Sequence, residues 1–375
     1  MIYPPREDSL LLAKWVKKLA RGKVLDMGTG SGIQAQTSAA KKSVQSVLAV
    51  DVDPAVIAHC RKSVASKKIT CVQSDLFAKV PAYQFDTIIF NPPYLPQELP
   101  ERDIALEGGK QGFETIRDFL YAANPYLAAD GTILLLFSSL SKKHEVEQAI
   151  QQNLFEFVEL DRLHIFFEDL YVYKITKSSL LKRIERSSIK NALYFARGKR
   201  SWVYRGTYRG RHCVVKVKRP DSAVDVPAKE SRMLRAVNKL GLGPRLFRAH
   251  KDFAVYEWVP GSYLKTELEH ANKKLKRSLF RQLFEQAFVL DQAGLTKEEM
   301  LRPLRNAIVT ARKKVVLIDF ERTHRTEKPH NVTQLCTFAA KEGIAPLKAI
   351  KHWAAHYKRQ PTRAAFAALL DGIGL

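Results

Sequence analysis

Short apolar runs alternate with longer stretches of helical periodicity over the first half of the 375-residue chain. This alternation predicts a parallel sheet with helices on its faces, an α/β fold. Two later runs, at residues 155–160 and 170–175, predict a closing hairpin. The five strands expected before that hairpin lie at residues 23–26, 47–51, 69–72, 85–90 and 131–137.

The pattern of apolar and polar positions changes near residue 177, where the second half begins. Its apolar runs are shorter, and its helical stretches come late in the chain, so it predicts an α+β arrangement. Expected strands lie at residues 201–210, 213–217, 254–259, 307–309 and 315–319, and expected helices at 227–239, 265–291 and from 333 onward. A chain of this length exceeds one ordinary core. We therefore expect two domains, residues 1–176 and residues 177–375.

Composition narrows the class of protein. The chain is 46% apolar and 27% charged, as globular proteins are. No stretch reaches the roughly eighteen uninterrupted apolar residues of a membrane span, and the first residues do not resemble a signal peptide. The four cysteines lack CxxC spacing, so we expect neither a zinc site nor disulfides. A cytoplasmic protein without a membrane partner is the resulting prediction.

The net charge of +24 is confined to the second half. Residues 1–176 carry 20 basic and 21 acidic side chains, a net of −1, whereas residues 177–375 carry 42 and 17, a net of +25. A thermophilic surface would be enriched in acidic residues as well, and this one is not. The asymmetry predicts that the second half binds a polyanion such as nucleic acid. Candidate phosphate contacts are the basic clusters at residues 197–200, 273–277 and 312–314.

A glycine-rich loop follows the first expected strand. Gly28, Gly30 and Gly32 would let the backbone approach a ligand closely at the start of a helix. Asp51 ends the second strand, where an acidic side chain accepts from ribose hydroxyls. Asp26 lies where a carboxylate could meet the amino group of a cofactor. Taken alone, this loop would suit a nicotinamide cofactor as well.

Asn91-Pro92-Pro93-Tyr94, at the end of the fourth strand, decides the class of cofactor. The Asn91 side-chain oxygen and the Pro92 carbonyl can both accept from a planar NH2 group, and Tyr94 offers a ring on which it can stack. Two prolines hold that backbone still. With Asp75 after the third strand, the pattern predicts a Rossmann-like, S-adenosylmethionine-dependent methyltransferase. The acceptor nitrogen stays open among adenine N6, cytosine N4 and a glutamine amide.

The first half resembles the HemK family of protein glutamine methyltransferases, in its archaeal and eukaryotic branch. Besides the Asn-Pro-Pro-Tyr motif, the resemblance rests on Tyr-Pro-Pro-Arg-Glu-Asp-Ser at residues 3–9 and Phe-Phe-Glu-Asp-Leu-Tyr-Val at residues 166–172. It implies methylation of the glutamine in the Gly-Gly-Gln motif of a translation release factor. Asn91 and Pro92 would orient the amide, and Tyr94 would pack against it.

The same resemblance implies two further features of the methyltransferase. Glu7-Asp8 would close the cofactor pocket. Relatives in this branch need a small zinc-binding activator, so a partner of that kind is expected.

A Lys–Glu pair gives the second half a pattern of phosphoryl transfer. Lys216 falls on an expected strand and Glu230 lies fourteen residues later in a helix, the pairing that holds ATP phosphates in protein kinases. Asp319, in Ile-Asp-Phe-Glu, corresponds to the Mg²⁺-binding Asp of the kinase Asp-Phe-Gly segment, with Glu321 in place of the glycine. These residues predict a two-lobed kinase-like domain that uses ATP and Mg²⁺.

The second half resembles RIO- and Bud-type atypical kinases of the archaeal branch, which include kinases of a tRNA ribose 2′-hydroxyl. Residues 297–306, Lys-Glu-Glu-Met-Leu-Arg-Pro-Leu-Arg-Asn, correspond to that family's His-Gly-Glu-Leu-x-Arg-Pro segment and its following Asn, without the His and Gly. The resemblance implies that Glu299 orients or deprotonates the hydroxyl, that Asp319 binds the metal, and that Asn306 assists.

The two halves together predict a bifunctional enzyme of the translation apparatus, which methylates a release-factor glutamine and phosphorylates tRNA. Two alternatives stay open. One is an RNA methyltransferase whose degenerate kinase domain only binds RNA. The other makes the second half a Ser/Thr protein kinase.

Overall fold

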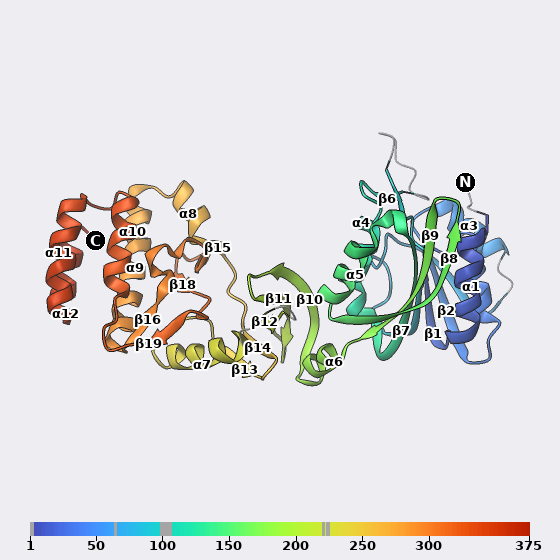
Figure 1. Ribbon diagram of the computed structural model, residues 1–375, viewed down its shortest axis with the longest axis horizontal. Coiled ribbons are helices and arrows are strands. Elements are labelled where there is room, and N and C mark those ends of the chain that lie inside the picture. Colours follow the sequence, from blue (N-terminus) through green and yellow to red (C-terminus); the bar gives the residue numbers. More distant parts are fainter. Residues whose placement is uncertain (1–3, 64–65, 98–106, 220–221, 223–225) are drawn as a thin grey trace. The chain divides into compact units, whose positions relative to one another are not determined.

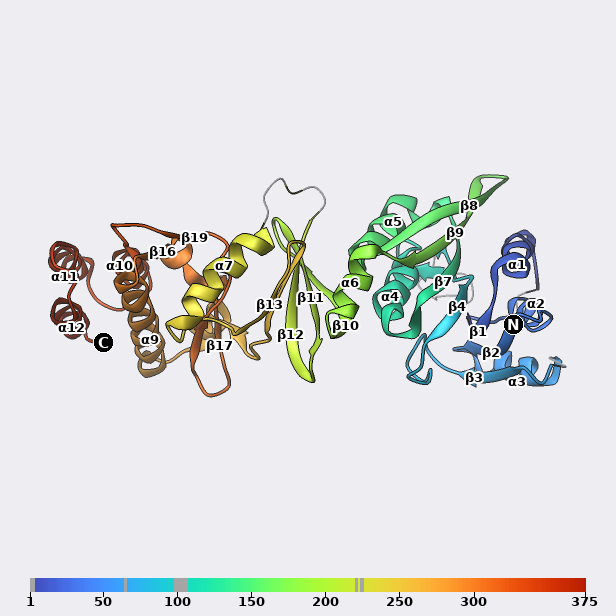
Figure 2. The same ribbon diagram turned by 90° about the horizontal axis from the view of Figure 1, so that it is seen from below.

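The computed structural model describes residues 4–63, 66–97, 107–219, 222 and 226–375, and its elements are drawn in Figure 1 and Figure 2. Two compact units divide the chain, Met1–Tyr194 and Phe195–Leu375, which we call unit 1 and unit 2. The division lies beyond residue 176, since helix α6 (Ser179–Arg186) packs with unit 1 through the bond of Lys182 to Asp130. No helix in the described part of the chain is long and apolar enough to cross a membrane.

Unit 1 is built on a seven-stranded sheet of order β3-β2-β1-β4-β7-β9-β8. Its parallel strands are β1 (Gly22–Met27), β2 (Val44–Asp51), β3 (Ile69–Gln73), β4 (Phe85–Phe90) and β7 (Leu127–Ser138). Strands β8 (Phe155–Ile165) and β9 (Glu168–Lys177) add the antiparallel hairpin. All seven were expected from the apolar runs. The Rossmann-like fold predicted for the first half is confirmed.

Helices cover both faces of this sheet. One face packs against α1, α2 and α3 through side chains such as Leu12 and Ala35. The other face packs against α4, where Phe119 lies 4.5 Å from the ring of Phe90. The bounds are α1 (Glu7–Leu19), α2 (Ile33–Ala39), α3 (Pro54–Ser63), α4 (Glu114–Ala123) and α5 (Lys143–Gln152), with short 3-10 turns η1 (Asn124–Tyr126) and η2 (Ser139–Ser141) and short strands β5 (Leu95–Pro96) and β6 (Glu107–Gly109).

A disulfide joins Cys60 of α3 to Cys71 of β3, with Cα atoms 6.5 Å apart. This contradicts the expectation of no disulfide. Helix α3 returns directly onto β3, so the crossover brings together two cysteines whose spacing along the chain resembles no known motif.

Unit 2 combines an antiparallel sheet with a mostly helical part. The sheet has the order β10-β11-β12-β14-β13, and α7 packs on it. Its elements are β10 (Ile189–Arg197), β11 (Ser201–Tyr208), β12 (Arg211–Lys218), α7 (Val226–Lys239), β13 (Leu246–Ala249) and β14 (Phe253–Glu257). Strand β10 spans the division between the units. This half is a mixed α/β structure, and its kinase-like assignment stays a prediction at this point.

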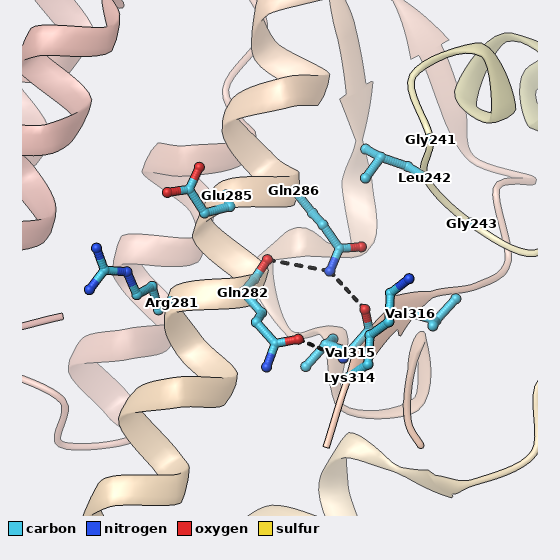
Figure 3. A pocket seen from close by; sticks show the side chains of 10 residues that line it. All are labelled: Gly241, Leu242, Gly243, Arg281, Gln282, Glu285, Gln286, Lys314, Val315 and Val316. Carbon is cyan, nitrogen blue, oxygen red and sulfur yellow. Dashed lines mark hydrogen bonds between the residues drawn. The ribbon is translucent and has the colours of Figure 1, made fainter. Parts of the chain in front are cut away.

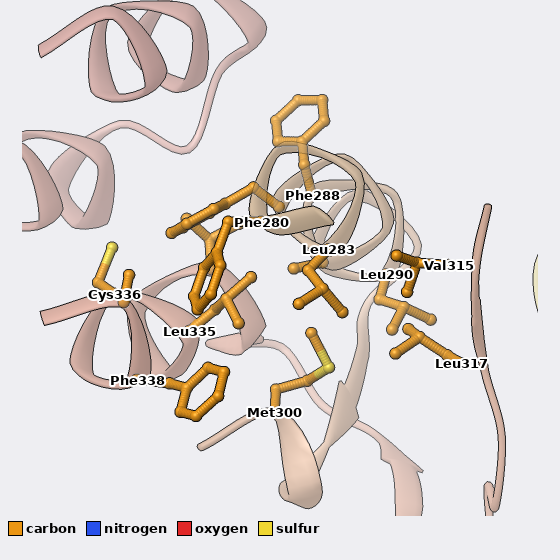
Figure 4. Packing of buried hydrophobic residues seen from close by; sticks show 14 of the residues in the cluster. Phe280, Leu283, Phe288, Leu290, Met300, Val315, Leu317, Leu335, Cys336 and Phe338 are labelled. Carbon is orange, nitrogen blue, oxygen red and sulfur yellow. The ribbon is translucent and has the colours of Figure 1, made fainter. Parts of the chain in front are cut away.

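The helical part of unit 2 encloses an extensive apolar core. Phe280 and Leu283 of α9 pack with Leu335 and Phe338 of α10, as Figure 4 shows. The helices are α8 (Leu264–His270), α9 (Lys273–Gln292), α10 (Asn331–Lys341), α11 (Leu347–Arg359) and α12 (Arg363–Gly372). One helix expected over residues 265–291 is in fact α8 and α9, since Asn272 caps α9 by accepting from the Leu275 N–H at 2.9 Å.

Short strands and 3-10 turns carry the polar segments of this part. The strands form two small sheets, β15-β17-β18 and β16-β19. Their bounds are β15 (Ser262–Tyr263), β16 (Leu295–Lys297), η3 (Glu298–Leu301), η4 (Pro303–Arg305), β17 (Ala307–Val309), β18 (Val315–Leu317) and β19 (Thr323–Arg325).

Candidate functional site

The glycine loop after β1 has the backbone that its sequence predicts. Gly28, Gly30 and Gly32 have φ values of +63°, +52° and +80°, in the left-handed region that glycine enters without a Cβ clash. The loop is fastened by the Thr29 N–H, which donates to the carbonyl of Val50 at 2.8 Å. Since α2 begins directly after Gly32, the loop presents its backbone at a helix start.

Two carboxylates support this loop from β1 and β2, Asp26 buried and Asp51 half-buried. Asp51 Oδ2 accepts from the Gly30 N–H at 3.0 Å, and Asp26 Oδ2 accepts from the Thr29 hydroxyl at 2.7 Å. Burial raises the pKa of both carboxyl groups, that of Asp26 to about 7. Asp75 is exposed and follows Ser74, whose N–H donates to the Asp51 carbonyl at 2.9 Å. The predicted residues of the first three strands thus meet at one edge.

Asp8 orients the side chain of Asn91, whereas from the sequence Asp8 was expected to help close the cofactor pocket. Asn91 Nδ2 donates to Asp8 Oδ2 at 2.9 Å, and Asp8 is only 4% exposed. Asn91 Oδ1 is buried and has no hydrogen-bond partner within the described residues. Asp8 therefore turns the amide so that its oxygen stays available to a donor from outside the protein. Glu7, grouped with Asp8 in the sequence, is exposed at the first position of α1.

The rest of the Asn-Pro-Pro-Tyr segment is held by its backbone. The Tyr94 carbonyl accepts from the Ser141 hydroxyl at 2.9 Å, while Pro92 is buried and the Tyr94 side chain is half-buried. A Cβ at Gly108 would lie 2.5 Å from the Pro93 carbonyl oxygen, so only glycine fits there. These contacts fix the direction of the backbone carbonyls beside Asn91.

A second cluster of charged side chains lies in unit 2, around Lys216. This side chain, on β12, places its Nζ 2.8 Å from Glu230 Oε2 on α7 and 2.9 Å from Asp319 Oδ1 after β18. Lys216 and Glu230 are 6% and 1% exposed. Burial alone would lower the pKa of Lys216, but the two carboxylates raise it well above its ordinary value. The predicted Lys–Glu–Asp set is therefore assembled.

Lys297 connects this cluster to Glu299. Its side chain is fully buried, its Nζ lies 3.1 Å from Glu299 Oε2, and it also donates to the main-chain carbonyl of Asp319. Asp319 has a φ of +61°, and the Lys297 Nζ lies 4.9 Å from the ring centre of Phe320. Burial lowers the pKa of Lys297. From the sequence, position 297 was interpreted only as lacking the His of the resembled kinase segment.

The remaining predicted residues of unit 2 border the same cluster. The Asn306 carbonyl accepts from the N–H of Ile318, the neighbour of Asp319, at 2.8 Å. Glu321, which replaces the kinase glycine, accepts from Arg200 at 2.9 Å and lies 3.8 Å from the Lys216 Nζ. Among the described residues, no three His, Cys, Asp or Glu side chains are placed to hold a metal ion. The Mg²⁺ assignment stays a prediction.

Two cavities open on the surface of unit 2. The first, about 360 Å³ and drawn in Figure 3, is lined by none of the predicted catalytic or cofactor-binding residues, and Lys314 is its one residue from the predicted phosphate contacts. Its Gln282 and Gln286 side chains bond the backbone of Val315 at 2.9 and 3.0 Å, so they serve packing. The second, about 640 Å³, is lined by basic and aromatic side chains, and Arg205 lies 4.2 Å from the Trp258 ring centre.

Known proteins match the first half. Residues 7–164 fit the family model of the methyltransferase small domain. A putative protein N5-glutamine methyltransferase of Methanocaldococcus jannaschii is 33% identical over 178 residues, which cover 46% of this chain and 89% of that protein.

Two bacterial relatives are matched over about half their length. The ribosomal protein uL3 glutamine methyltransferase of Bordetella pertussis is 39% identical over 138 residues, 33% of this chain and 46% of that protein. The release factor glutamine methyltransferase of Shewanella oneidensis is 31% identical over 162 residues, 39% of this chain and 54% of that protein. Together with the glycine loop, the two carboxylates that support it and the oriented Asn91, these matches show that the chain belongs to the methyltransferase small-domain family, its first half being an S-adenosylmethionine-dependent methyltransferase.

Proposed function

We propose that unit 1 methylates the side-chain amide nitrogen of a glutamine in a protein of the translation apparatus, the Gly-Gly-Gln glutamine of a release factor. The unpaired, buried Oδ1 of Asn91 carries this proposal, because it offers a fixed acceptor for a planar NH2 group. The names of the three relatives support it, since each refers to glutamine methylation and two refer to a ribosomal protein or a release factor.

The residues present fit S-adenosylmethionine. The loop of Gly28 to Gly32 has room for close backbone approach, Asp51 would accept from the ribose, and Asp26 would face the amino group. When bound, this cofactor supplies a methyl group activated by a sulfonium. Asp75, at the end of β3, and Glu7, at the start of α1, stay proposed cofactor contacts.

The chain's own part in the reaction is to hold the amide. Asn91 Oδ1 and the Pro92 carbonyl would accept its two N–H groups, and Tyr94 would cover its plane. Two acceptors polarise the N–H bonds, which raises the electron density on nitrogen as it attacks. The nitrogen loses one proton after attack, so one of these oxygens can hold that proton until water takes it. No separate general base is then needed.

Mass spectrometry of a release factor incubated with the protein and S-adenosylmethionine tests this proposal. We expect a gain of one methyl group on the Gly-Gly-Gln glutamine, and its loss with Asn91→Ala. A parallel reaction contains a small zinc-binding activator, the partner that the family resemblance implies. Methyl transfer to RNA alone would overturn the glutamine assignment in favour of the RNA methyltransferase alternative.

We propose for unit 2 that it transfers a phosphoryl group from ATP, with Mg²⁺, to a ribose 2′-hydroxyl of tRNA. The observation that favours this second function is Lys216, held between Glu230 and Asp319, the arrangement that protein kinases use for ATP phosphates and metal. Glu299 would accept from the hydroxyl, and Asp319 with Asn306 would bind Mg²⁺. The net charge of +25 over residues 177–375 supports an RNA substrate.

Incubation with γ-labelled ATP and bulk tRNA tests this second function. We expect label in tRNA from the wild-type protein and none from Asp319→Ala. Label in protein instead would favour the Ser/Thr kinase alternative. If tRNA is retained on a filter without being labelled, unit 2 is a binding module only.

A further inference from the structure

The turn between β8 and β9 carries two phenylalanines in water. Ile165 pairs with Glu168, so the turn consists of Phe166 and Phe167 alone, which are 92% and 98% exposed. Phe166 has a φ of +45°, where two-residue hairpin turns usually have Gly, Asn or Asp. A bulky side chain at such a φ is an outlier that costs the fold stability. Both rings are therefore present although the backbone conformation at Phe166 and the exposure of the rings to water are unfavourable.

This turn lies at the same edge of the sheet as Asn91. Strand β9 runs antiparallel to β7 with Leu170 opposite Ser138, the last residue of β7, so the turn extends beyond the carboxyl end of that strand. Asn91 directly follows the carboxyl end of β4, which is parallel to β7. In Figure 2 the turn end of the hairpin stands clear of the neighbouring strands.

Hydrogen bonds connect the base of the hairpin to the Asn-Pro-Pro-Tyr segment through η2. The Glu168 carboxylate accepts from the Ser138 hydroxyl, and the Asp169 N–H donates to the Ser139 hydroxyl at 3.1 Å. Ser141, at the other end of η2, donates to the Tyr94 carbonyl at 2.9 Å. The hairpin is thus fastened to the backbone of the site.

Two leucines extend the exposed apolar surface at this edge. Leu140, inside η2, is 42% exposed, and Leu10, two residues after Asp8 on α1, is 60% exposed. We call Leu10, Leu140, Phe166 and Phe167 the apolar rim. Exposed large apolar side chains at the same edge of a sheet as an active site are typical of a surface that binds a protein.

The charges beside the rim favour a protein over RNA as its occupant. The two residues after the phenylalanines are the acids Glu168 and Asp169, and the cation Arg162, on the neighbouring strand, is paired with Asp169 at 2.6 Å. Binding of RNA depends on unneutralised cations near the phosphates. Residues 1–176 carry no such excess, with a net charge of −1.

We propose that the apolar rim docks the protein substrate of unit 1, with Phe166 and Phe167 entering an apolar depression on that protein near the glutamine to be methylated. This inference rests on the proposed glutamine methylation. It assigns substrate selection to two layers: Asn91 recognises the amide, and the rim recognises the folded protein that carries it.

The test compares a full-length release factor with a Gly-Gly-Gln peptide of about ten residues, which lacks the folded surface that the rim would bind. The variant is Phe166→Gly with Phe167→Ser, which suits the turn better than the native pair and so keeps the hairpin folded. The matched control is Tyr83→Ser, which removes an exposed aromatic side chain just before β4, at the opposite edge of the sheet. Initial rates of methyl transfer are measured for both substrates.

We expect the double variant to lower kcat/KM for the release factor about 30-fold, mainly through KM, which is the scale of losing an interface hot spot. Its kcat/KM for the peptide should stay within about twofold of wild type, and Tyr83→Ser should change neither substrate. An unchanged KM for the release factor would overturn the docking proposal alone. If the wild-type protein methylates neither substrate, the glutamine assignment falls and the docking proposal with it.

Two other occupants give their own signatures. A loss of methyl transfer to RNA, with the release factor unaffected, would place RNA on the rim. A dimer in the wild type that becomes a monomer in the double variant, by sedimentation, would place a second copy there. Either result overturns the assignment to the protein substrate.

Discussion

Asp26→Asn removes the group whose protonation should control the binding of S-adenosylmethionine. Burial raises the pKa of Asp26 to about 7, because a carboxylate without water around it is unfavourable. In the proposed site this carboxylate faces the positively charged amino group of the cofactor, which stays protonated near neutral pH. Only the ionised form of Asp26 can then pair with it.

The expected size of the effect follows from that pKa. Asp26 is about one tenth ionised at pH 6 and about half ionised at pH 7, where the α-amino group of the cofactor is still mostly protonated. The dissociation constant of S-adenosylmethionine should therefore fall about fivefold over this range, about 1 kcal/mol of binding free energy. In the cofactor-free protein, the ionisation of Asp26 has the opposite effect and lowers the stability of the fold. The folded protein holds a proton that the unfolded chain has lost, so its stability falls as the pH rises from about 4 to about 7.

Calorimetric titration with S-adenosylmethionine at pH 6, 6.5 and 7 measures the slope. Asp26→Asn keeps the shape of the side chain and its acceptor for the Thr29 hydroxyl, so the variant should fold and bind weakly at every pH. A wild-type affinity that does not change with pH would refute the reasoning. So would a variant that shows the same slope as the wild type.

Three further substitutions test the contacts around the two sites. Asp8→Ala frees the Asn91 amide to rotate, so kcat for glutamine methylation should fall about 10- to 100-fold, the worth of a charge-assisted hydrogen bond, while the affinity for S-adenosylmethionine measured by calorimetry stays unchanged. Lys297→Met removes the donor to the Asp319 carbonyl and the contact with Glu299, so kcat for tRNA phosphorylation should fall about 10- to 100-fold, and Lys297→His should restore part of it. Lys216→Met leaves a buried carboxylate on α7 unpaired, so thermal unfolding should show a loss of about 3–5 kcal/mol together with loss of phosphorylation.

The fold of unit 1 could be predicted because its strands are buried on both faces. Such strands read as continuous apolar runs, and β4 (Phe85–Phe90) is an example that is bounded correctly to the residue. The end of the unit was harder to place. The composition turns basic at residue 177, but Leu181 and Ile184 of α6 are fully buried. The charge composition therefore changes at residue 177, whereas the packed unit continues to Tyr194. A boundary drawn from composition lies earlier in the chain than the end of this unit.

The site was predictable where topology alone determines it. The carboxyl ends of parallel strands meet at one edge, so Asp51 and Asn91 could be assigned to one site from their positions after strands. The hydrogen-bond partner of Asn91 could not be predicted from the sequence. Asp8 lies 83 residues away along the chain, and nothing in the sequence shows which of Glu7 and Asp8 turns toward the sheet when α1 packs. The contact depends on the rotation of one helix.

Lys297 is a second residue whose contacts could not be predicted from the sequence. A lysine in place of an expected His indicates a lost function, because lysine side chains are almost always solvated. Here the side chain is fully buried, contacts Glu299 and donates to the Asp319 carbonyl. Lys297 is therefore part of the cluster around Asp319, and the lysine at this position does not by itself indicate that the cluster has lost its function.

The basic charge of unit 2 is too large for the fold to absorb. Lys276, Lys313 and Arg200, drawn from the three basic clusters, already pair with Glu342, Glu267 and Glu321. Residues 195–375 contain only 16 acidic side chains against 37 basic ones, so 21 cations would remain even if every acid paired with one of them. Such an excess repels itself unless a polyanion neutralises it. Near-neutral residues 1–176 carry no such cost, so the charge distribution agrees with the proposals of a protein substrate for unit 1 and an RNA substrate for unit 2.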